Sequence, residues 1–283
     1  MGRDGGIGEV AFVLGGGGIL GAHEVGMLRA LAQSGIQPDL VLGTSVGAVN
    51  GALFAADPTE DGVERLSRLW RDTELSEVSA GGLLRSVTTL ARSGTHIQSL
   101  QDARERLVRA LPVERVEDLK VPFQCVAASI ERAAEHWFDT GDLADVILAS
   151  CAVPGVLPPV KIGDEHFIDG GIVNSIPVAR AVTLGATSIY VLQVGRLEKP
   201  LQPPRWPWEV ALVAFEVARR HRFAHDLQSL PDGVALHVLP TGGSAAPAYN
   251  NVSGQLRLRR IARTVQQQID TSYEASLQYL AER

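Results

Sequence analysis

The sequence predicts an α/β protein of three layers, in which helices cover both faces of a mainly parallel central sheet. Apolar, β-rich segments alternate with helical patterns along the first part of the chain. Such alternation is typical of parallel sheets with right-handed crossover connections. The chain has 283 residues, 45% of them hydrophobic, which is enough to bury a large core. We therefore expect a single domain over residues 1–283, with the main motifs in 9–195 and an extension of helices and a strand in 196–283.

The first expected strand, at residues 9–14, is apolar enough to be buried on both faces and runs directly into a glycine-rich loop. A helix is expected next, at residues 22–33, because apolar residues recur there at helical spacing and Ser34-Gly35 follows as a stop signal. This strand, loop and helix begin the alternating pattern.

The glycine loop permits two chemical interpretations. Gly16, Gly18 and Gly21 have the spacing of a dinucleotide-binding loop, but that site needs an acidic residue at the end of the second strand. Here Asp39 comes before that strand, and no Gly-Lys-Ser/Thr sequence follows that would make a P-loop. Alternatively, the loop is an oxyanion hole, since the N–H groups of successive glycines can approach a substrate closely and point into one concavity.

A second glycine-bounded turn follows the short strand expected at residues 40–42. Its sequence is Gly43-Thr44-Ser45-Val46-Gly47, and an Ala/Val/Leu-rich run that predicts a helix comes next. A strand, a Gly-x-Ser-x-Gly turn and a helix make the pattern of a nucleophile elbow, which exposes the serine on a strained turn. Ser45 is therefore the candidate nucleophile. The alternative is a glycine-rich turn that only packs a strand against a helix.

Residues 59–113 are expected to be mainly helical, with amphipathic segments at 63–70 and 101–111. The Ser/Gly-rich stretch 77–94 is either a mobile cap over the site or a plain surface connection. The remaining expected elements, in order, are strands at 121–129 and 135–138, a helix at 143–151, an extended segment at 156–160, a strand at 166–168, a helix ending at 184, a strand at 188–194, an irregular segment at 196–208, a helix at 209–230, a strand at 234–239 and a helix at 256–282.

The helix expected at residues 209–230 carries a stripe of Val, Leu and Phe and a basic face around Arg219 to Arg222. We expect the apolar stripe to pack into the core and the basic face to meet solvent. The alternative is that this basic amphipathic helix lies on an anionic membrane. Residues 200–230 could also form part of a lid.

A serine hydroxyl is a weak nucleophile until a base takes its proton. The histidines in the last third of the chain are His221, His225 and His237, and they fall in an expected helix and strand rather than on glycine-bounded loops. Asp169 is the better candidate, because it ends a strand and Gly170 and Gly171 leave its carboxylate uncrowded. Partial burial would raise its pKa, while N–H donors would oppose the rise. The alternative is that Asp169-Gly170 is only a hairpin turn.

Composition excludes several classes of protein. The formal net charge of −6 and the absence of a long basic run argue against a nucleic-acid binder. The seven histidines show no metal-ligand spacing, and Cys125 and Cys151 are expected to be buried free thiols. The N-terminus lacks the apolar core of a signal peptide, and no apolar run is long enough to span a membrane. We therefore expect a cytoplasmic protein without metal or cofactor.

Three motifs in this order resemble those of the patatin-like phospholipase family, and bacterial members in particular. They are Gly16-x-Gly18-x-x-Gly21, Gly43-Thr44-Ser45-Val46-Gly47 and Asp169-Gly170-Gly171. Neighbouring stretches resemble the family as well: residues 21–31, Asn50-Gly51, residues 149–159 and residues 169–178. The likeness covers roughly residues 9–195, and it is loose in the last third of the chain.

The resemblance implies a lipid acyl hydrolase that works without metal through a Ser–Asp dyad. Ser45 would attack the ester carbonyl, and Asp169 would accept its proton and later activate water. By motif position, the oxyanion would be held by backbone N–H groups of Gly16, Gly17 and Gly18, together with that of Val46. The implied partner is a lipid or acyl-ester substrate, with transient contact to a membrane surface.

One residue departs from the family pattern. Members of the family usually carry Arg or Lys directly before the last glycine of the first motif, where this chain has Leu20. A simple lipid or acyl ester is therefore an alternative to a phospholipid substrate. Two other hypotheses remain: a nucleotide-binding protein that uses the 16–21 loop, and a catalytically weak scaffold that keeps the fold.

Overall fold

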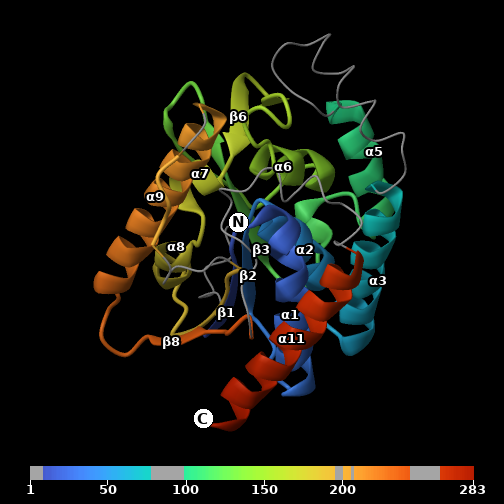
Figure 1. The fold of residues 1–283 in the computed structure, drawn as a ribbon, viewed down its shortest axis with the longest axis vertical. Helices are drawn as coiled ribbons and strands as arrows, with labels where there is room; N and C mark the ends of the chain where they lie inside the picture. Colours follow the sequence, from blue (N-terminus) through green and yellow to red (C-terminus); the bar gives the residue numbers. More distant parts are fainter. Residues whose placement is uncertain (1–8, 78–98, 195–199, 205–206, 243–261) are drawn as a thin grey trace, which may run out of the picture.

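The computed structural model describes residues 9–77, 99–194, 200–204, 207–242 and 262–283. An eight-stranded sheet lies between two layers of helices, so the predicted three-layer α/β/α class is confirmed (Figure 1). The strands are β1 (Val10–Leu14), β2 (Leu40–Thr44), β3 (Phe123–Ser129), β4 (Ala134–Phe138), β5 (Val160–Ile162), β6 (Glu165–Asp169), β7 (Ser188–Leu192) and β8 (Ala235–Val238).

The two helical layers differ in size. One face of the sheet carries α1 (Ala22–Gln33), α2 (Val46–Ala56), α3 (Glu60–Glu77), α5 (Leu100–Ala110), α6 (Leu143–Ser150) and α11 (Ala262–Ala281) (Figure 1). The other face carries α7 (Gly171–Asn174), α8 (Val178–Thr183) and α9 (Pro207–Gln228). Two short 3₁₀ helices, η1 (Gly18–Gly21) and η2 (Val116–Asp118), lie in connecting loops.

The sheet has a parallel part and an antiparallel end. Its order is β5-β6-β3-β2-β1-β7-β8, with β4 also paired to β3. The strands β3, β2, β1, β7 and β8 are parallel neighbours, as the alternating pattern predicts. By contrast, β4 and β6 pair antiparallel to β3, and β5 pairs antiparallel to β6. The sheet is thus mixed, with its parallel part at the centre.

The long strand β3 aligns two other strands end to end. Along one edge of β3, β4 pairs with the whole stretch from Cys125 to Ser129. The other edge is shared: β2 pairs with it as far as Val126, opposite Thr44, and β6 takes over at Ala127, opposite Asp169. Because β2 is parallel and β6 antiparallel to β3, their carboxyl ends meet head to head. Residues that directly follow Thr44 must therefore lie beside Asp169.

The C-terminal part of the chain is packed into the same layers. β8 extends the parallel sheet beside β7, and α11 lies along α1 (Figure 1). The approach of the two helices is close, since a Cβ on Gly26 would lie 2.1 Å from the backbone oxygen of Ile269. The Ser272 hydroxyl also donates a hydrogen bond of 2.8 Å to the His23 carbonyl oxygen.

Several expected elements differ in the structure or lie outside the residues it describes. The Asp169-Gly170 sequence is not a hairpin turn, because α7 begins two residues after Asp169. The extended segment expected at 156–160 becomes a strand only at Val160, where pairing with β6 starts. Most of the possible cap at 77–94, and residues 256–261 of the last expected helix, lie outside the described residues. Among the described helices, none is both long and apolar enough to cross a bilayer.

The expected orientation of α9 holds only in part over the residues whose side chains are described. We expected its apolar stripe in the core and its basic face, around Arg219 to Arg222, in solvent. Phe223 is buried and His221 is exposed, as expected. However, Glu216, Arg219 and Asp226 are 6%, 2% and 5% exposed, whereas Val210 and Val217 are 54% and 53% exposed. The inward charges are paired, with Arg219 Nη1 at 3.1 Å from Glu216 Oε1, which offsets part of the cost of burying them.

Candidate active site

Ser45 occupies the sharp turn between β2 and α2. Its backbone has φ 55° and ψ −124°, a conformation that side-chain-bearing residues rarely adopt. The glycines on either side permit the turn, because a Cβ on Gly43 would lie 2.6 Å from the Ala48 Cα and one on Gly47 would lie 2.4 Å from the Leu14 carbonyl oxygen. The turn is therefore built as the nucleophile-elbow interpretation requires.

The Ser45 hydroxyl donates a hydrogen bond of 2.6 Å to Asp169 Oδ2 across 124 residues of sequence. Ser45 is 9% exposed and Asp169 is 1% exposed, so the bond is shielded from water. The other carboxylate oxygen, Oδ1, accepts the Gly171 N–H at 2.7 Å. The structure thus brings together the serine and the carboxylate that the sequence singled out.

Burial raises the pKa of Asp169 to about 6, while the hydrogen bonds from the Ser45 hydroxyl and the Gly171 N–H oppose the rise. A carboxylate in water has a pKa near 4 and is too weak a base to take a proton from serine effectively. The burial of Asp169 therefore strengthens it as a base, yet leaves it ionised at neutral pH.

Ser150, at the end of α6, is a site residue that the sequence analysis did not single out. Its hydroxyl accepts the Ser45 N–H at 2.9 Å and donates to the Val126 carbonyl oxygen at 2.7 Å. Its own carbonyl oxygen accepts the Gly170 N–H at 3.3 Å. One buried serine thus ties the Ser45 turn, β3 and the Asp169 turn together. The only signal in the sequence was its place within residues 149–159, which resemble the family.

Cys151 follows Ser150 and faces the same two groups. Burial raises the pKa of its thiol, the Asp169 carboxylate adds to the rise, and hydrogen bonding with Ser45 opposes it. The thiol therefore lines the Ser45–Asp169 pair in its neutral form. Cys125 lies deeper in the core, where burial raises its pKa above the ordinary range.

The glycine loop passes directly against Ser45. A Cβ on Gly16 would lie 3.5 Å from the Ser45 Cβ. The Gly16 N–H, however, donates to the Ser175 carbonyl oxygen at 3.0 Å, so its predicted place in the oxyanion hole is wrong. Next in the loop, Gly17 is buried against Val194, and Gly18 has φ 55° and is exposed.

A buried network behind the loop holds it in place. Asn50 on α2 donates to the Gly21 carbonyl oxygen at 3.0 Å and to Glu24 Oε2 at 2.7 Å, and it accepts the Trp70 indole N–H at 2.9 Å. Burial raises the pKa of Glu24 well above its usual value. A Cβ on Gly21 would lie 2.5 Å from Val46 Cγ2, so the loop and α2 pack without a gap.

The other candidate groups lie elsewhere. Asp39, which a ribose site would need at the end of β2, lies before that strand and accepts the Val10 N–H at 3.0 Å. His221 and His225 are exposed on α9, and His237 stacks on Tyr190 with ring centroids 4.5 Å apart. Within the described residues, no group of three or more His, Cys, Asp or Glu side chains could hold a metal ion.

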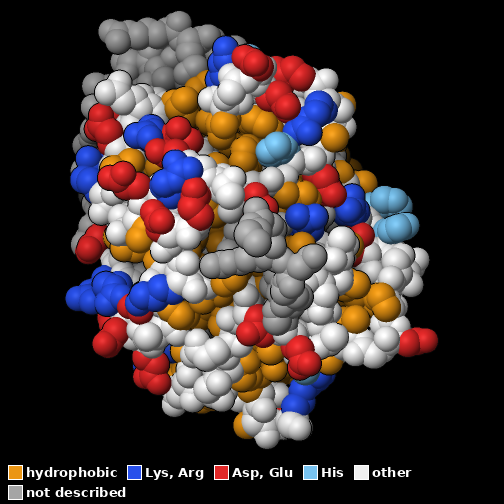
Figure 2. Space-filling view, turned by 180° about the vertical axis from the view of Figure 1, so that it is seen from behind, with side chains coloured by type: hydrophobic (Ala, Val, Ile, Leu, Met, Phe, Trp, Pro, Cys, Tyr) orange, Lys and Arg blue, Asp and Glu red, His pale blue; other side chains and the backbone are white. Residues whose placement is uncertain are grey.

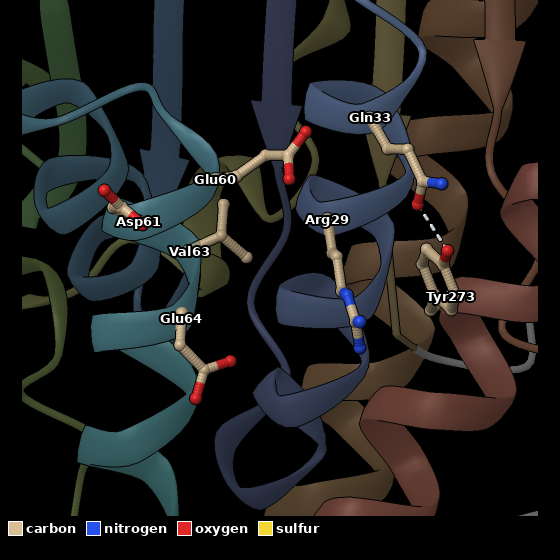
Figure 3. A pocket seen from close by; sticks show the side chains of 7 residues that line it. All are labelled: Arg29, Gln33, Glu60, Asp61, Val63, Glu64 and Tyr273. Atoms are coloured by element: carbon tan, nitrogen blue, oxygen red, sulfur yellow. Dashed lines mark hydrogen bonds between the residues drawn. The ribbon is translucent and has the colours of Figure 1, made fainter.

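A polar cavity of about 400 Å³ lies between α1, α3 and α11 (Figure 3). It is lined by Arg29, Gln33, Glu60, Asp61, Val63, Glu64 and Tyr273. Because α1 runs back from the carboxyl edge of the sheet, its last residues, Arg29 and Gln33 among them, lie near the opposite edge. The carboxylates in the lining also make the cavity a poor site for an acyl chain.

The chain is similar in sequence to known proteins. The family model described as patatin-like phospholipase matches residues 12–182. Patatin-like phospholipase domain-containing protein 7 of Rattus norvegicus is 33% identical over 188 residues, which are 66% of this chain and 14% of that protein. Lysophospholipase nte1 of Emericella nidulans is 30% identical over 189 residues, 67% of this chain and 12% of that protein.

The chain thus spans only about one seventh of the length of these relatives. A solved structure, VipD from Legionella pneumophila, is similar at a TM-score of 0.49 and 16% identity, covering 98% of this chain and 67% of VipD.

Proposed function

The chain belongs to the patatin-like phospholipase family, and from this premise we propose that it is a serine acyl hydrolase that cleaves a carboxylic ester of a lipid. The observation that carries the proposal is the 2.6 Å hydrogen bond between the Ser45 hydroxyl and Asp169 Oδ2. A serine on a strained turn, bonded to a buried carboxylate, supplies a nucleophile and a base without a histidine.

In the proposed reaction, Ser45 Oγ attacks the ester carbonyl carbon while its proton passes to Asp169. The tetrahedral intermediate then collapses, the C–O bond to the alcohol breaks, and Asp169 returns the proton to the leaving oxygen. In the second half, Asp169 takes a proton from water, and the resulting hydroxide attacks the acyl-enzyme. Collapse of that intermediate releases the fatty acid, and the proton returns to Ser45.

The negative charge that develops on the carbonyl oxygen needs donors beside Ser45. We assign this role to the backbone N–H groups of Gly17, Gly18 and Val46. Gly17 and Gly18 follow Gly16, which packs against Ser45. Val46 is the first residue of α2, whose positive helix end favours the developing charge.

The proposed chemistry would cleave many carboxylic esters, so the substrate class has to be argued separately. Relatives named lysophospholipases make a lysophospholipid the first candidate, and a transient contact with a membrane surface would supply it. The alternative is a simple acyl ester, since Leu20 replaces the cation that the family usually carries in the glycine loop. The protein would need neither metal nor cofactor for either reaction.

Labelling with a fluorophosphonate probe tests the proposal directly. We expect an adduct on Ser45 in the wild type, and loss of both labelling and ester turnover in Ser45→Ala. Asp169→Asn should reduce both at least about a hundredfold, because it removes the base. The matched control is Ser99→Ala, which changes only the cap of α5.

Turnover should be measured on p-nitrophenyl esters, lysophospholipids and phospholipids. A folded wild-type protein that neither labels nor hydrolyses any of these would favour the scaffold hypothesis. Full turnover in Ser45→Ala, together with nucleotide-dependent thermal stabilisation, would favour the nucleotide-binding hypothesis instead.

A further inference from the structure

The glycine loop is attached at its two ends to different parts of the molecule. At its start, the Gly16 N–H donates to the Ser175 carbonyl oxygen at 3.0 Å. At its end, the Gly21 carbonyl oxygen accepts a hydrogen bond of 3.0 Å from the side-chain amide of Asn50 on α2. The two glycines that we propose as oxyanion donors lie between these attachments. Their position therefore depends on Asn50.

The end of the loop packs against the helix that begins directly after the nucleophile. Val46 is the first residue of α2 and Asn50 lies one turn further on, so both are on the same face of this helix. A Cβ on Gly21 would lie 2.5 Å from Val46 Cγ2, which shows how closely the loop contacts this face. Because the Val46 N–H is the third proposed oxyanion donor, the contact sets the position of the loop donors relative to the donor on α2.

Trp70 of α3 fixes the orientation of the Asn50 amide. α3 packs against α2 in the same helical layer (Figure 1). The indole N–H of Trp70 can only donate, and it bonds Asn50 Oδ1 at 2.9 Å. The amide nitrogen is thereby directed to the Gly21 carbonyl oxygen and to Glu24 Oε2. The Trp70 ring also borders the loop, since a Cβ on Gly21 would lie 2.8 Å from Trp70 Cζ2. Trp70 thus holds the loop both directly and through Asn50.

The burial of this network distinguishes it from the polar groups of the surface. Figure 2 shows acidic and basic side chains interspersed over the face of the molecule that it displays, where water solvates them. Asn50 and Glu24, by contrast, are 0% exposed, and burial of polar groups costs free energy that hydrogen bonds must offset. The oxygen and the nitrogen of the Asn50 amide are both bonded, so the amide is fixed in one orientation. The network is therefore suited to hold the loop in a single position.

We propose that Asn50 and Trp70 are positioning residues, which align the oxyanion donors of the glycine loop with Ser45 and Val46. This inference rests on the proposed function for the reaction itself. The charge on the carbonyl oxygen develops only in the transition state, so misaligned donors weaken transition-state binding and leave ground-state binding unchanged. Trp70 thereby makes the reaction depend on α3, although it lies outside the three motifs.

Two ligands separate alignment of the donors from correct folding alone. An alkyl trifluoromethyl ketone adds to Ser45 Oγ: the serine proton passes to Asp169, and the ketone oxygen takes the negative charge into the oxyanion hole. An ether analogue of a lysophospholipid has no carbonyl group and measures ground-state binding. Dissociation constants for both ligands are measured with Trp70→Phe, which removes the indole N–H but keeps an aromatic ring.

Trp70→Phe should weaken binding of the ketone at least about fivefold and lower kcat/KM for a p-nitrophenyl ester by a similar factor. Binding of the ether analogue should stay within about twofold of the wild type. Asn50→Ala removes the bond to Gly21 itself, so its loss should be larger, about fiftyfold or more. Trp70→Phe decides the question if Asn50→Ala does not fold.

The matched control is Trp137→Phe, because the Trp137 ring stacks with Arg180 of α8 in the opposite helical layer. This variant should bind both ligands like the wild type. Ser276→Ala controls for a loss of stability alone, since it removes a buried hydrogen bond to the Pro240 carbonyl oxygen. It should lower the free energy of unfolding but keep the ratio of the two dissociation constants.

Three results would overturn the inference. They are unchanged ketone binding in Trp70→Phe, equal weakening of the ketone and the ether analogue in that variant, and an equal loss of ketone binding in Trp137→Phe. Failure of the proposed function is a separate result, since the wild type would then form no fluorophosphonate adduct on Ser45. Failure of this inference leaves the wild type labelled and active.

Discussion

Asp169 combines two properties that oppose each other. It is 1% exposed, and burial raises its pKa to about 6. Above that pH its charge is buried in the folded protein but solvated in the unfolded chain, so ionisation costs stability. The same burial makes the carboxylate a stronger base. The residue thus exchanges stability for reactivity, as functional sites commonly do.

The pKa of Asp169 predicts how the rate depends on pH. With a water-soluble p-nitrophenyl ester, kcat/KM should fall as the pH decreases through about 6, because a protonated Asp169 cannot accept the Ser45 proton. The measurement is a pH–rate profile between pH 4.5 and 8.5, with stability checked at each end. A profile that stays flat down to pH 4.5 would contradict the role of Asp169 as base.

The same pKa predicts a gain in stability when the charge is removed. Asp169→Asn should raise the free energy of unfolding at pH 8 by about 1–3 kcal/mol, since a raised pKa makes the ionised form costly in the fold. The cost is complete above about pH 6 and disappears below the usual pKa of 3.8. Urea unfolding at pH 8 and at pH 3.5 should therefore show a gain only at the higher pH.

Substitution of Ser150 should lower both the stability and kcat. Ser150→Ala leaves the Ser45 N–H and the Val126 carbonyl oxygen without their partner. We expect a loss of about 1–3 kcal/mol in stability and a fall in kcat of roughly tenfold or more, with a smaller change in KM. Ser276→Ala is the matched control, because Ser276 is buried and bonds the Pro240 carbonyl oxygen. It should lower stability but leave kcat unchanged.

At the scale of elements, β3 controls the geometry of the site. Its shared edge ends the pairing with β2 at Val126 and begins the pairing with β6 at Ala127. The turn after Asp169 must also pass close to β3, since a Cβ on Gly170 would lie 2.1 Å from the Val126 carbonyl oxygen. The pairing of β2 and β6 along β3 therefore sets the distance between Ser45 and Asp169.

Gly170→Ala tests this dependence. The added Cβ would push the Asp169 turn away from β3, so we expect labelling of Ser45 by a fluorophosphonate to fall at least about tenfold. The contrasting control is Gly163→Ala, at a hairpin where φ is 61° and a Cβ would meet no atom within 4 Å. It should cost about 1 kcal/mol of stability through backbone strain and leave labelling intact. Equal labelling in the two variants would contradict the argument.

At the scale of the whole molecule, the end of the chain completes the helical layer that begins near its start. α11 packs along α1, with Gly26 at their closest approach. α1 in turn follows the glycine loop, which is held through Gly21, Asn50 and Glu24. Packing of the C-terminal helix therefore supports the loop from behind, at a distance from the reacting groups.

Gly26→Ala should weaken this contact. A Cβ there would lie 2.1 Å from the Ile269 carbonyl oxygen, so α11 must shift, and we expect a loss of about 2 kcal/mol or more in stability. Limited proteolysis should cleave near α11 sooner than in the wild type, while the intact fraction keeps its ester turnover. Gly35→Ala, just beyond α1, is the control: a Cβ there meets nothing within 4 Å, so with φ at 71° we expect a loss of only about 1 kcal/mol through backbone strain and no earlier cleavage near α11.

The sequence alone determined the alternating elements, the Ser45 turn and the choice of Asp169. Those features depend on short-range patterns: a buried strand, glycines that permit a tight turn, and helical periodicity. α1 accordingly lies where its spacing and stop signal predicted it. The same reasoning ranked Asp169 above the histidines, because residues next to glycines at strand ends can be recognised locally.

Only the tertiary structure decided which groups meet. The 2.6 Å Ser45–Asp169 bond depends on the register of β2 and β6 along β3, and Ser150 joins that site through contacts distant in sequence. Gly16 donates its N–H to the Ser175 carbonyl oxygen, and α9 buries Glu216, Arg219 and Asp226 while it exposes Val210 and Val217. Periodicity tells which residues share a face of a helix or strand. Which face is buried, and against what, is set by partners that fold from elsewhere in the chain.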